Sequence, residues 1–298
     1  MYSLTIHIII YVILCTIITF TISGNLLVII IISHFRQLHT PTNFLTLSLA
    51  VADFLLGGIV MPPSMIRSVE ACWYFGDFFC KFHTSTDIML SATSIIHLFF
   101  ISVDRYYAVC HPFKYRTKIN LIQIGKIVLI SWSLPVIQHS EYYYFETLYC
   151  VGSCIPVQSV ESVLLLALLT FYIPGCIMIG IYLKIFIVAK KQARAIRETM
   201  ESKYSSTRKR EAKAAKTLAI VIVVFLVCWC PFILCNSILN YETPARVVEA
   251  LIWISYLNSA FNPFIYAFFY TWFRKALRII VMGNIFRNNS SLTKLYME

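Results

Sequence analysis

Apolar stretches of about the length needed to cross a lipid bilayer recur along nearly the whole chain. The hydrocarbon core of a bilayer is about 30 Å thick, so a spanning helix needs about 20 mostly apolar residues. The chain has 298 residues, of which 59% are hydrophobic and only 13% are charged, too few charges to cover a soluble domain. The predicted spans are about 4–33, 43–66, 79–109, 122–137, 159–189, 212–239 and 247–270. A soluble core helix can imitate one span but not seven, so the sequence predicts an all-α membrane protein, a seven-transmembrane helix bundle.

The basic residues indicate how this bundle is oriented. The first stretch is too long for a signal-peptide core and lacks a small-residue cleavage pattern, so we interpret it as a retained anchor. All of the 25 Lys and Arg residues except Arg67, Lys81 and Arg246 fall on one side of the predicted bundle. Positive loops face the cytosol, so we expect the N-terminus outside and the tail, 282–298, in the cytosol. This asymmetry accounts for the net charge of +11 better than nucleic-acid binding does, and no nucleic-acid partner is expected.

Two cytosolic segments have helical composition. The connection 190–216 is expected to extend the fifth and sixth helices inward, with a break at Ser205, Ser206 and Thr207. After the seventh span, about 271–281, basic and apolar residues segregate, which predicts a short amphipathic helix on the inner membrane surface rather than a solvated tail. Its apolar face would carry Phe273, Ala276, Leu277 and Ile280, and its basic face Arg274, Lys275 and Arg278.

The predicted third helix carries charges at both ends of one face. Asp87 and Arg105 are separated by about five helical turns, or about 27 Å, so they share a face and lie near opposite membrane surfaces. Ser91 and Ser94 follow Asp87 on the same stripe. A polar face of this kind is expected to point into the bundle.

Asp87 is a candidate ligand anchor because no cationic residue lies within its own helical turn. An unpaired carboxylate in a partly dry pocket requires a cation from outside, and an aromatic-walled cleft with one acid suits a protonated amine. The alternative is that Asp87 pairs with a loop cation such as Lys81. Aromatic residues in the outer halves of later spans are Phe171, Trp229, Phe232, Trp253 and Tyr256.

A second buried carboxylate, Asp53, falls in the middle of the second span. The polar residues of other spans that we expect near it are Asn25, Ser94, Asn258, Ser259 and Asn262. Oxygen ligands suit hard cations, so this cluster is a candidate site for a hydrated sodium ion. The alternative is that these residues simply hydrogen-bond the helices together, and the residues alone do not separate the two interpretations.

Charged residues at the inner end suggest an ion pair between the third and sixth helices. Asp104 and Arg105 end the third span, and Glu211 begins the sixth at the same depth. An Arg105–Glu211 pair would hold the inner ends of these helices together, and breaking it would open a cytosolic cleft. Pro231 and Pro263, beside Trp229 and Asn262, are candidate hinges because a proline frees a backbone carbonyl within a helix.

The predicted outer loops contain four cysteines. Cys72 and Cys80 precede the third span, and Cys150 and Cys154 precede the fifth. Facing an oxidising compartment, a disulfide between these two regions is favoured. The residues alone leave the disulfide pairing open. The cysteines do not form a cluster that indicates a zinc site, so sodium is the only metal ion that we expect.

Seven motifs then occur in a fixed order along the predicted helices. They are "GNLLV" (24–28), "LAVAD" (49–53), Cys80, "DRY" (104–106), Trp132, "CWCP" (228–231) and "NPFIY" (262–266). Together they resemble a rhodopsin-like (class A) G-protein-coupled receptor over essentially the whole chain. The resemblance implies that Trp229 is the toggle beneath the ligand, that Asp53 centres the sodium site and that Cys80 pairs with Cys154. It also implies an activation switch, to which we assign Asp104, Arg105, Tyr106, Glu211, Asn262, Pro263 and Tyr266.

A narrower resemblance concerns the ligand. The run "NSAFNPFIYAFFYTWF" (258–273) is similar to the trace amine-associated receptors. This implies a multi-pass plasma-membrane receptor for small amines, mostly olfactory in this group, that engages a stimulatory G protein and arrestin and raises cAMP. Asp87 would bind the ammonium, with Tyr256 as its partner and Ser91 beside it. In catecholamine receptors, three positions of the fifth span carry the hydroxyl residues that bind the catechol. The corresponding residues here are Leu166, Ala167 and Thr170, of which only Thr170 is polar, which favours a monoamine with an apolar body.

The outer end departs from the family pattern. Family members usually have an N-terminal tail with glycosylation sequons and a cysteine, whereas this chain begins almost inside its first span. Its sequons, at Asn288 and Asn289, fall on the cytosolic side. We therefore expect a truncated gene model or poor surface delivery, with Cys72 as a substitute partner for Cys150.

Other classes of membrane protein fit the sequence less well. A transporter or channel for organic cations remains the alternative, but repeated hydropathy halves or a ring of like charges are not apparent. A retinal photoreceptor needs a lysine in the seventh span, and residues 247–270 contain none. The loops lack a Ser-His-Asp order, a metal-ligand cluster or a phosphate loop, so we do not expect an enzyme.

Overall fold

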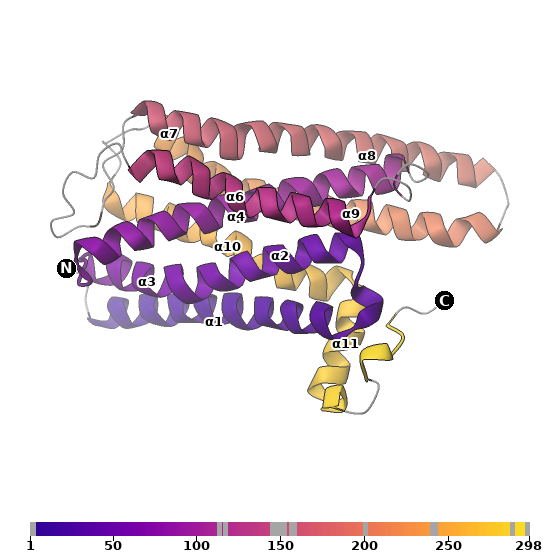
Figure 1. The fold of residues 1–298 in the computed structure, drawn as a ribbon, viewed down its shortest axis with the longest axis horizontal. Helices are drawn as coiled ribbons and strands as arrows, with labels where there is room; N and C mark the ends of the chain where they lie inside the picture. The colour runs from indigo at the N-terminus through magenta and orange to yellow at the C-terminus, as the bar shows by residue number, and fades with distance from the viewer. Residues whose placement is uncertain are drawn as a thin grey trace.

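The computed structural model describes residues 4–111, 115, 119–143, 154, 160–198, 202–238, 244–286 and 290–295. Every regular element in these ranges is a helix, and the long helices lie side by side along one axis (Figure 1). Large apolar side chains such as Ile8, Leu129, Ile187 and Val223 are exposed on the outside of the bundle. A surface of this kind requires lipid rather than water around it.

The helices lie where the hydropathy of the sequence placed the spans. The first is α1 (Leu4–His34), and the second consists of α2 (Pro41–Leu55), a π-helical turn (Leu56–Val60) and α3 (Met61–Glu70). The third and fourth are α4 (Gly76–Cys110) and α6 (Leu121–Tyr143). The fifth consists of α7 (Val160–Ala167), a π-helical turn (Leu168–Tyr172) and α8 (Ile173–Glu198). The sixth and seventh are α9 (Ser202–Ile238) and α10 (Ala245–Phe269), followed by α11 (Thr271–Val281).

Five of these helices are long and apolar enough, by composition alone, to cross a membrane within the described residues. The fourth span has a shorter apolar core, Leu121–Val136. The seventh, α10, is less apolar than these five because it carries Asn258, Ser259 and Asn262, polar side chains that are all buried inside the bundle. The polar face of α10 is therefore surrounded by protein.

One local expectation was wrong. Ser205, Ser206 and Thr207 do not separate the fifth and sixth helices, because α9 begins at Ser202 and runs through all three. Ser and Thr disfavour a helix interior by only a few tenths of a kcal/mol, and the alanines and basic residues that follow are strong helix formers. The break inferred from three adjacent hydroxyl residues was therefore misplaced.

Both π-helical turns lie just before a proline. Leu56–Val60 precedes Pro62 and Pro63, and Leu168–Tyr172 precedes Pro174. A proline has no N–H to donate to the preceding turn, and a wide turn is one way for a helix to absorb that loss. Each turn changes the phase of its helix, so α3 and α8 present different faces than a constant period of 3.6 residues would give.

The amphipathic helix predicted after the seventh span is confirmed as α11, which runs across the inner end of the bundle (Figure 1). Trp272, Phe273 and Ala276 are buried against apolar residues of α1, while Arg274 is exposed. The Arg274 guanidinium donates to the backbone oxygens of Phe268 (2.6 Å) and Ala267 (3.1 Å). It thereby satisfies carbonyls that are left free at the end of α10.

Helices α1 and α10 approach closely at Gly24. A Cβ atom built there would lie 2.9 Å from both Cβ and Cγ of Pro263. We expect Gly24→Val to destabilise the detergent-solubilised protein by about 1–3 kcal/mol, because a larger side chain must push these helices apart. The measurement is the midpoint of thermal unfolding. Gly125→Ala is the matched control, since a Cβ at Gly125 meets no atom within 4 Å. Equal midpoints for the two variants would contradict the close approach.

Candidate ligand site

Asp87 points from α4 toward α10. Its Oδ2 accepts a hydrogen bond of 2.6 Å from the hydroxyl of Tyr256, and its Oδ1 accepts one of 3.2 Å from Ser91, one turn further along α4. The ion pairs among the described residues are Arg67–Glu249 and Asp104–Arg105, so Asp87 has no Lys or Arg partner in this part of the chain. Lys81, the alternative partner that the sequence left open, does not pair with it. The carboxylate is hydrogen-bonded but forms no ion pair with a described Lys or Arg.

A buried network fixes the direction of the Tyr256 hydroxyl. His83 Nε2 lies 3.0 Å from the Val60 carbonyl oxygen, and a carbonyl only accepts, so Nε2 carries the proton. The same nitrogen lies 3.1 Å from Ser64 Oγ, which lies 3.5 Å from the Tyr256 oxygen. The single Nε2–H of His83 is shared between the Val60 carbonyl and Ser64 Oγ, which leaves the Ser64 hydroxyl free to donate to Tyr256, and Tyr256 donates to Asp87.

Sequence reasoning missed His83 and Ser64. His83 precedes Asp87 by four residues, which places both on one face of α4. That spacing is the signal that could have identified it, since the exposed fraction of His83 is only 1%. Ser64 lies beyond the π-helical turn, where the sequence periodicity gives no reliable face.

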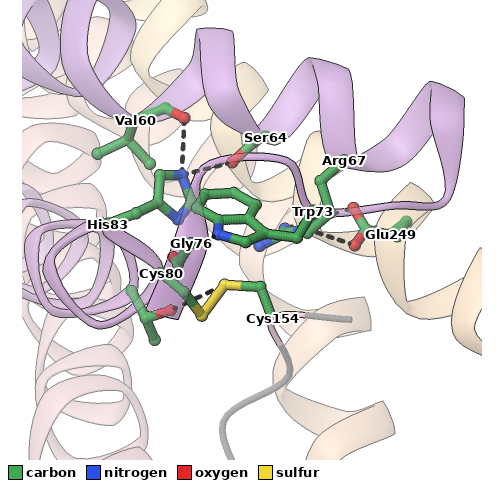
Figure 2. The surroundings of a disulfide bond; sticks show 10 residues. Val60, Ser64, Arg67, Trp73, Gly76, Cys80, His83, Cys154 and Glu249 are labelled. Carbon is green, nitrogen blue, oxygen red and sulfur yellow. Dashed lines mark hydrogen bonds and ion pairs between the residues drawn. A yellow bond between two sulfur atoms is a disulfide. The ribbon is translucent and has the colours of Figure 1, made fainter. Parts of the chain in front are cut away.

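An ion pair between α3 and α10 lies at the outer end of the site, and Figure 2 shows it beside the His83 network. Arg67 Nε lies 2.8 Å from Glu249 Oε1, and Arg67 Nη2 lies 3.4 Å from Glu249 Oε2. Ser68 Oγ donates to Glu249 Oε2 at 2.5 Å and accepts from Trp253 Nε1 at 3.0 Å. The Trp253 ring in turn meets Tyr256 edge-on, with centroids 5.5 Å apart. Contacts thus connect this ion pair to the residue that binds Asp87.

A disulfide lies next to this network (Figure 2). Cys80, near the start of α4, is bonded to Cys154, as the family resemblance implied. Trp73 packs against both cysteines and against the ring of His83. Cys72 forms no disulfide among the described residues, and Cys150 lies outside them. The bond ties residue 154 to α4 about two turns above Asp87.

The remaining aromatic candidates form a separate cluster. Trp229 and Phe232 of α9 meet with centroids 6.5 Å apart, and Phe171 packs on Phe225 with centroids 5.5 Å apart. These side chains belong to a core between α4, α8 and α9. The Thr170 hydroxyl bonds to the Leu166 carbonyl of its own helix at 2.6 Å. Tyr256, Trp253 and Ser91 are therefore connected to Asp87 by the described contacts, whereas the described hydrogen bonds and ring contacts do not connect the other four to it.

Two helices, α4 and α10, bring hydrogen-bond donors to Asp53 of α2. Its Oδ1 accepts from Ser94 (2.9 Å) and Ser259 (2.7 Å), and its Oδ2 accepts from Asn262 (2.7 Å). The carboxylate is fully buried. Nearby, Asn25 donates to the Ser259 carbonyl at 3.1 Å. The Oδ1 atoms of Asn25 and Asn258 are buried without a hydrogen-bond partner among the described residues, so the cluster has oxygen acceptors left over.

At the inner end, Asp104 is the centre of a second network. Its Oδ2 lies 2.6 Å from Arg105 Nη2 and accepts from Thr42 at 2.7 Å, while its Oδ1 accepts from Tyr115 at 2.9 Å. Arg105 also contacts Thr42. Burial and the charge of Asp104 raise the pKa of Tyr115, so its hydroxyl remains a donor at physiological pH. Thr42 and Tyr115 were not identified from the sequence.

The other predicted switch residues lie around this end. The Glu211 side chain is outside the described residues, and the predicted Arg105–Glu211 pair stays a prediction. The Tyr106 hydroxyl lies 3.4 Å from His111 Nε2. Tyr266, three residues after Pro263, is buried with Tyr270 at a centroid distance of 5.9 Å. Among the described residues, Arg105 forms hydrogen bonds to Asp104 and Thr42 and none to α9.

Comparison with known proteins gives a consistent result. Residues 24–266 match the model of the 7 transmembrane receptor (rhodopsin family). The chain is 50% identical to trace amine-associated receptor 1 of Macaca mulatta, over 97% of this chain and 92% of that receptor. It is 49% identical to the human trace amine-associated receptor 1, over 97% of this chain and 91% of that receptor. It is also 47% identical to trace amine-associated receptor 4 of Rattus norvegicus, over 96% and 88% of the two chains.

Proposed function

Because the chain belongs to the rhodopsin family of seven-transmembrane receptors, and within it to the trace amine-associated receptors, we propose that it is a receptor for small protonated monoamines. The observation that carries this proposal is the Asp87 carboxylate, which is hydrogen-bonded by Tyr256 and Ser91 but has no cationic partner among the described residues. An ammonium group supplies the missing charge. Membership of this family makes the chain a multi-pass membrane protein that signals through a G protein, not an enzyme, and favours a receptor over a transporter or channel.

The geometry suggests how an amine would be held. The ammonium forms an ion pair with Asp87, and Tyr256 keeps one carboxylate oxygen oriented by donating to it. Trp253 and Tyr256 offer aromatic surface next to the cation. The Thr170 hydroxyl donates to its own helix, and the neighbouring candidate positions Leu166 and Ala167 are apolar, which supports an apolar ligand body over a catechol. We further propose the finer family properties, namely coupling to a stimulatory G protein, a rise in cAMP, arrestin binding and an olfactory role.

A cAMP screen in cells that express the chain tests this proposal. Primary, tertiary and cyclic monoamines are compared with neutral alcohols of the same shape, with and without an N-terminal tail grafted from a relative. We expect responses to amines only, since an alcohol cannot neutralise Asp87. Equal potency of an amine and its alcohol would contradict the proposal.

We also propose that the Asp53 cluster holds a sodium ion. The residues fit, because Asp53 supplies the charge and the unpartnered oxygens of Asn25 and Asn258 are acceptors. Bound sodium would supply the positive charge that the buried carboxylate otherwise lacks, and Ser94, Ser259 and Asn262 orient that carboxylate between three helices.

This proposal predicts a sodium effect on agonist binding. Replacing choline by sodium at constant ionic strength is expected to lower agonist affinity in membranes by about fivefold or more, because the ion stabilises the arrangement in which these helices are held together. Asp53→Asn should remove the dependence. A sodium effect that survives in this variant would support hydrogen bonding as the only role of the cluster.

A further inference from the structure

Apart from Asp87, a second acid lies at the outer end of the bundle, and it is already neutralised. Glu249 of α10 receives two hydrogen bonds from the Arg67 guanidinium and one from Ser68. The exposed fractions of the two side chains are 12% for Arg67 and 26% for Glu249. The pair is partly shielded from water, and removing one partner of such a pair leaves the other charge partly buried and uncompensated, so the carboxylate alone would favour another cation.

The ion pair belongs to the surroundings of the ligand site. Glu249 precedes Tyr256 by seven residues of α10, so it lies on the same face, on the order of 10 Å further out. Arg67 interacts electrostatically with Glu249, Tyr256 and Asp87. His83 likewise interacts with Asp87, Arg67 and Glu249. Contacts through Ser68, Trp253 and Tyr256 also connect Glu249 to Asp87, so the two acids and the guanidinium belong to one network at the outer end of the site.

We propose that Arg67 determines amine selectivity by masking Glu249, so that the receptor offers a ligand one free acid instead of two. This inference rests on the proposed function and specifies its substrate class. A linear diamine that placed one ammonium on Asp87 would carry its second toward Glu249. There it meets a carboxylate whose charge is already matched, next to a like-charged guanidinium. Monoamines present no second charge and are accepted.

The test compares 1-aminopentane with the diamines from 1,4-diaminobutane to 1,8-diaminooctane, using the cAMP response of the full chain normalised to receptor at the surface. Arg67→Met frees Glu249 and is expected to raise diamine potency relative to 1-aminopentane by at least tenfold. Arg67→Met combined with Glu249→Gln is the matched control and should show no such gain. The exchanged pair, Arg67→Glu with Glu249→Arg, should keep the monoamine preference of the original chain.

A second measurement does not depend on the stability of Arg67→Met. Glu249→Gln leaves the guanidinium unpaired near Asp87, so we expect monoamine potency to fall by about threefold to tenfold and to recover in the double variant. Suppose that the receptor responds to monoamines and that this response depends on Asp87. If Arg67→Met then left the ratio of diamine to monoamine potency unchanged, and Glu249→Gln left monoamine potency unchanged, the masking role alone would be overturned. A receptor silent to every amine in all variants would overturn the proposed function together with it.

Discussion

Asp87→Asn is expected to lower the potency of small monoamines by at least 100-fold. The substitution keeps the size of the side chain and removes the negative charge that no described Lys or Arg neutralises. Leaving one partner of a buried ion pair without the other costs about 3–5 kcal/mol, and 1.4 kcal/mol corresponds to a factor of ten. The measurement is the cAMP dose–response curve at equal surface expression.

Tyr256→Phe is the matched comparison for this prediction. It keeps the aromatic ring next to Trp253 and removes only the hydroxyl that donates to Asp87. A single hydrogen bond is worth about 0.5–1.5 kcal/mol, so potency should fall by only about threefold to tenfold. If Asp87→Asn were as mild as Tyr256→Phe, an ionic anchor at Asp87 would be untenable.

The second large effect is expected on the delivery of the receptor to the cell surface. Cys80→Ser or Cys154→Ser opens a loop whose ends are 74 residues apart in the sequence. Loss of a native disulfide that closes a loop of this length costs about 4 kcal/mol. Trp73 also loses the buried bond on which it packs next to His83. We expect most of the protein to be retained inside the cell, measured as the ratio of surface to total epitope-tagged receptor.

Cys72→Ser serves as the control for the disulfide variants. Cys72 is half-buried and forms no disulfide among the described residues, so its replacement should leave surface delivery nearly unchanged. Normal delivery of Cys80→Ser would show that the bond is dispensable for folding of the outer end.

The features that followed from sequence are those with a strong local signal. The apolar spans and the segregated faces of α11 follow from composition and periodicity alone. Asp53 and Asp87 were identifiable because a carboxylate in an apolar helix is rare, and their polar partners stand out in the same way. For Asp53, three of these partners are in direct contact.

Contacts that depend on the rotation of one helix against another were not predictable. The π-helical turn at Leu56–Val60 changes the phase of α3, so the faces of Ser64 and Arg67 do not follow from Asp53 by counting turns. The Arg67–Glu249 pair joins residues 182 positions apart, and each looks like an ordinary charge at a helix end when considered alone. Similarly, Thr42 carries no signal that would place it on Asp104.

The most direct test of the ionic anchor is an experimental structure of the chain bound to an amine agonist and a G protein. The account predicts that the ligand nitrogen lies about 2.7–2.9 Å from a carboxylate oxygen of Asp87, with Tyr256 still on that carboxylate. A ligand nitrogen placed elsewhere, with Asp87 bound to a lysine or arginine of the chain, would contradict it.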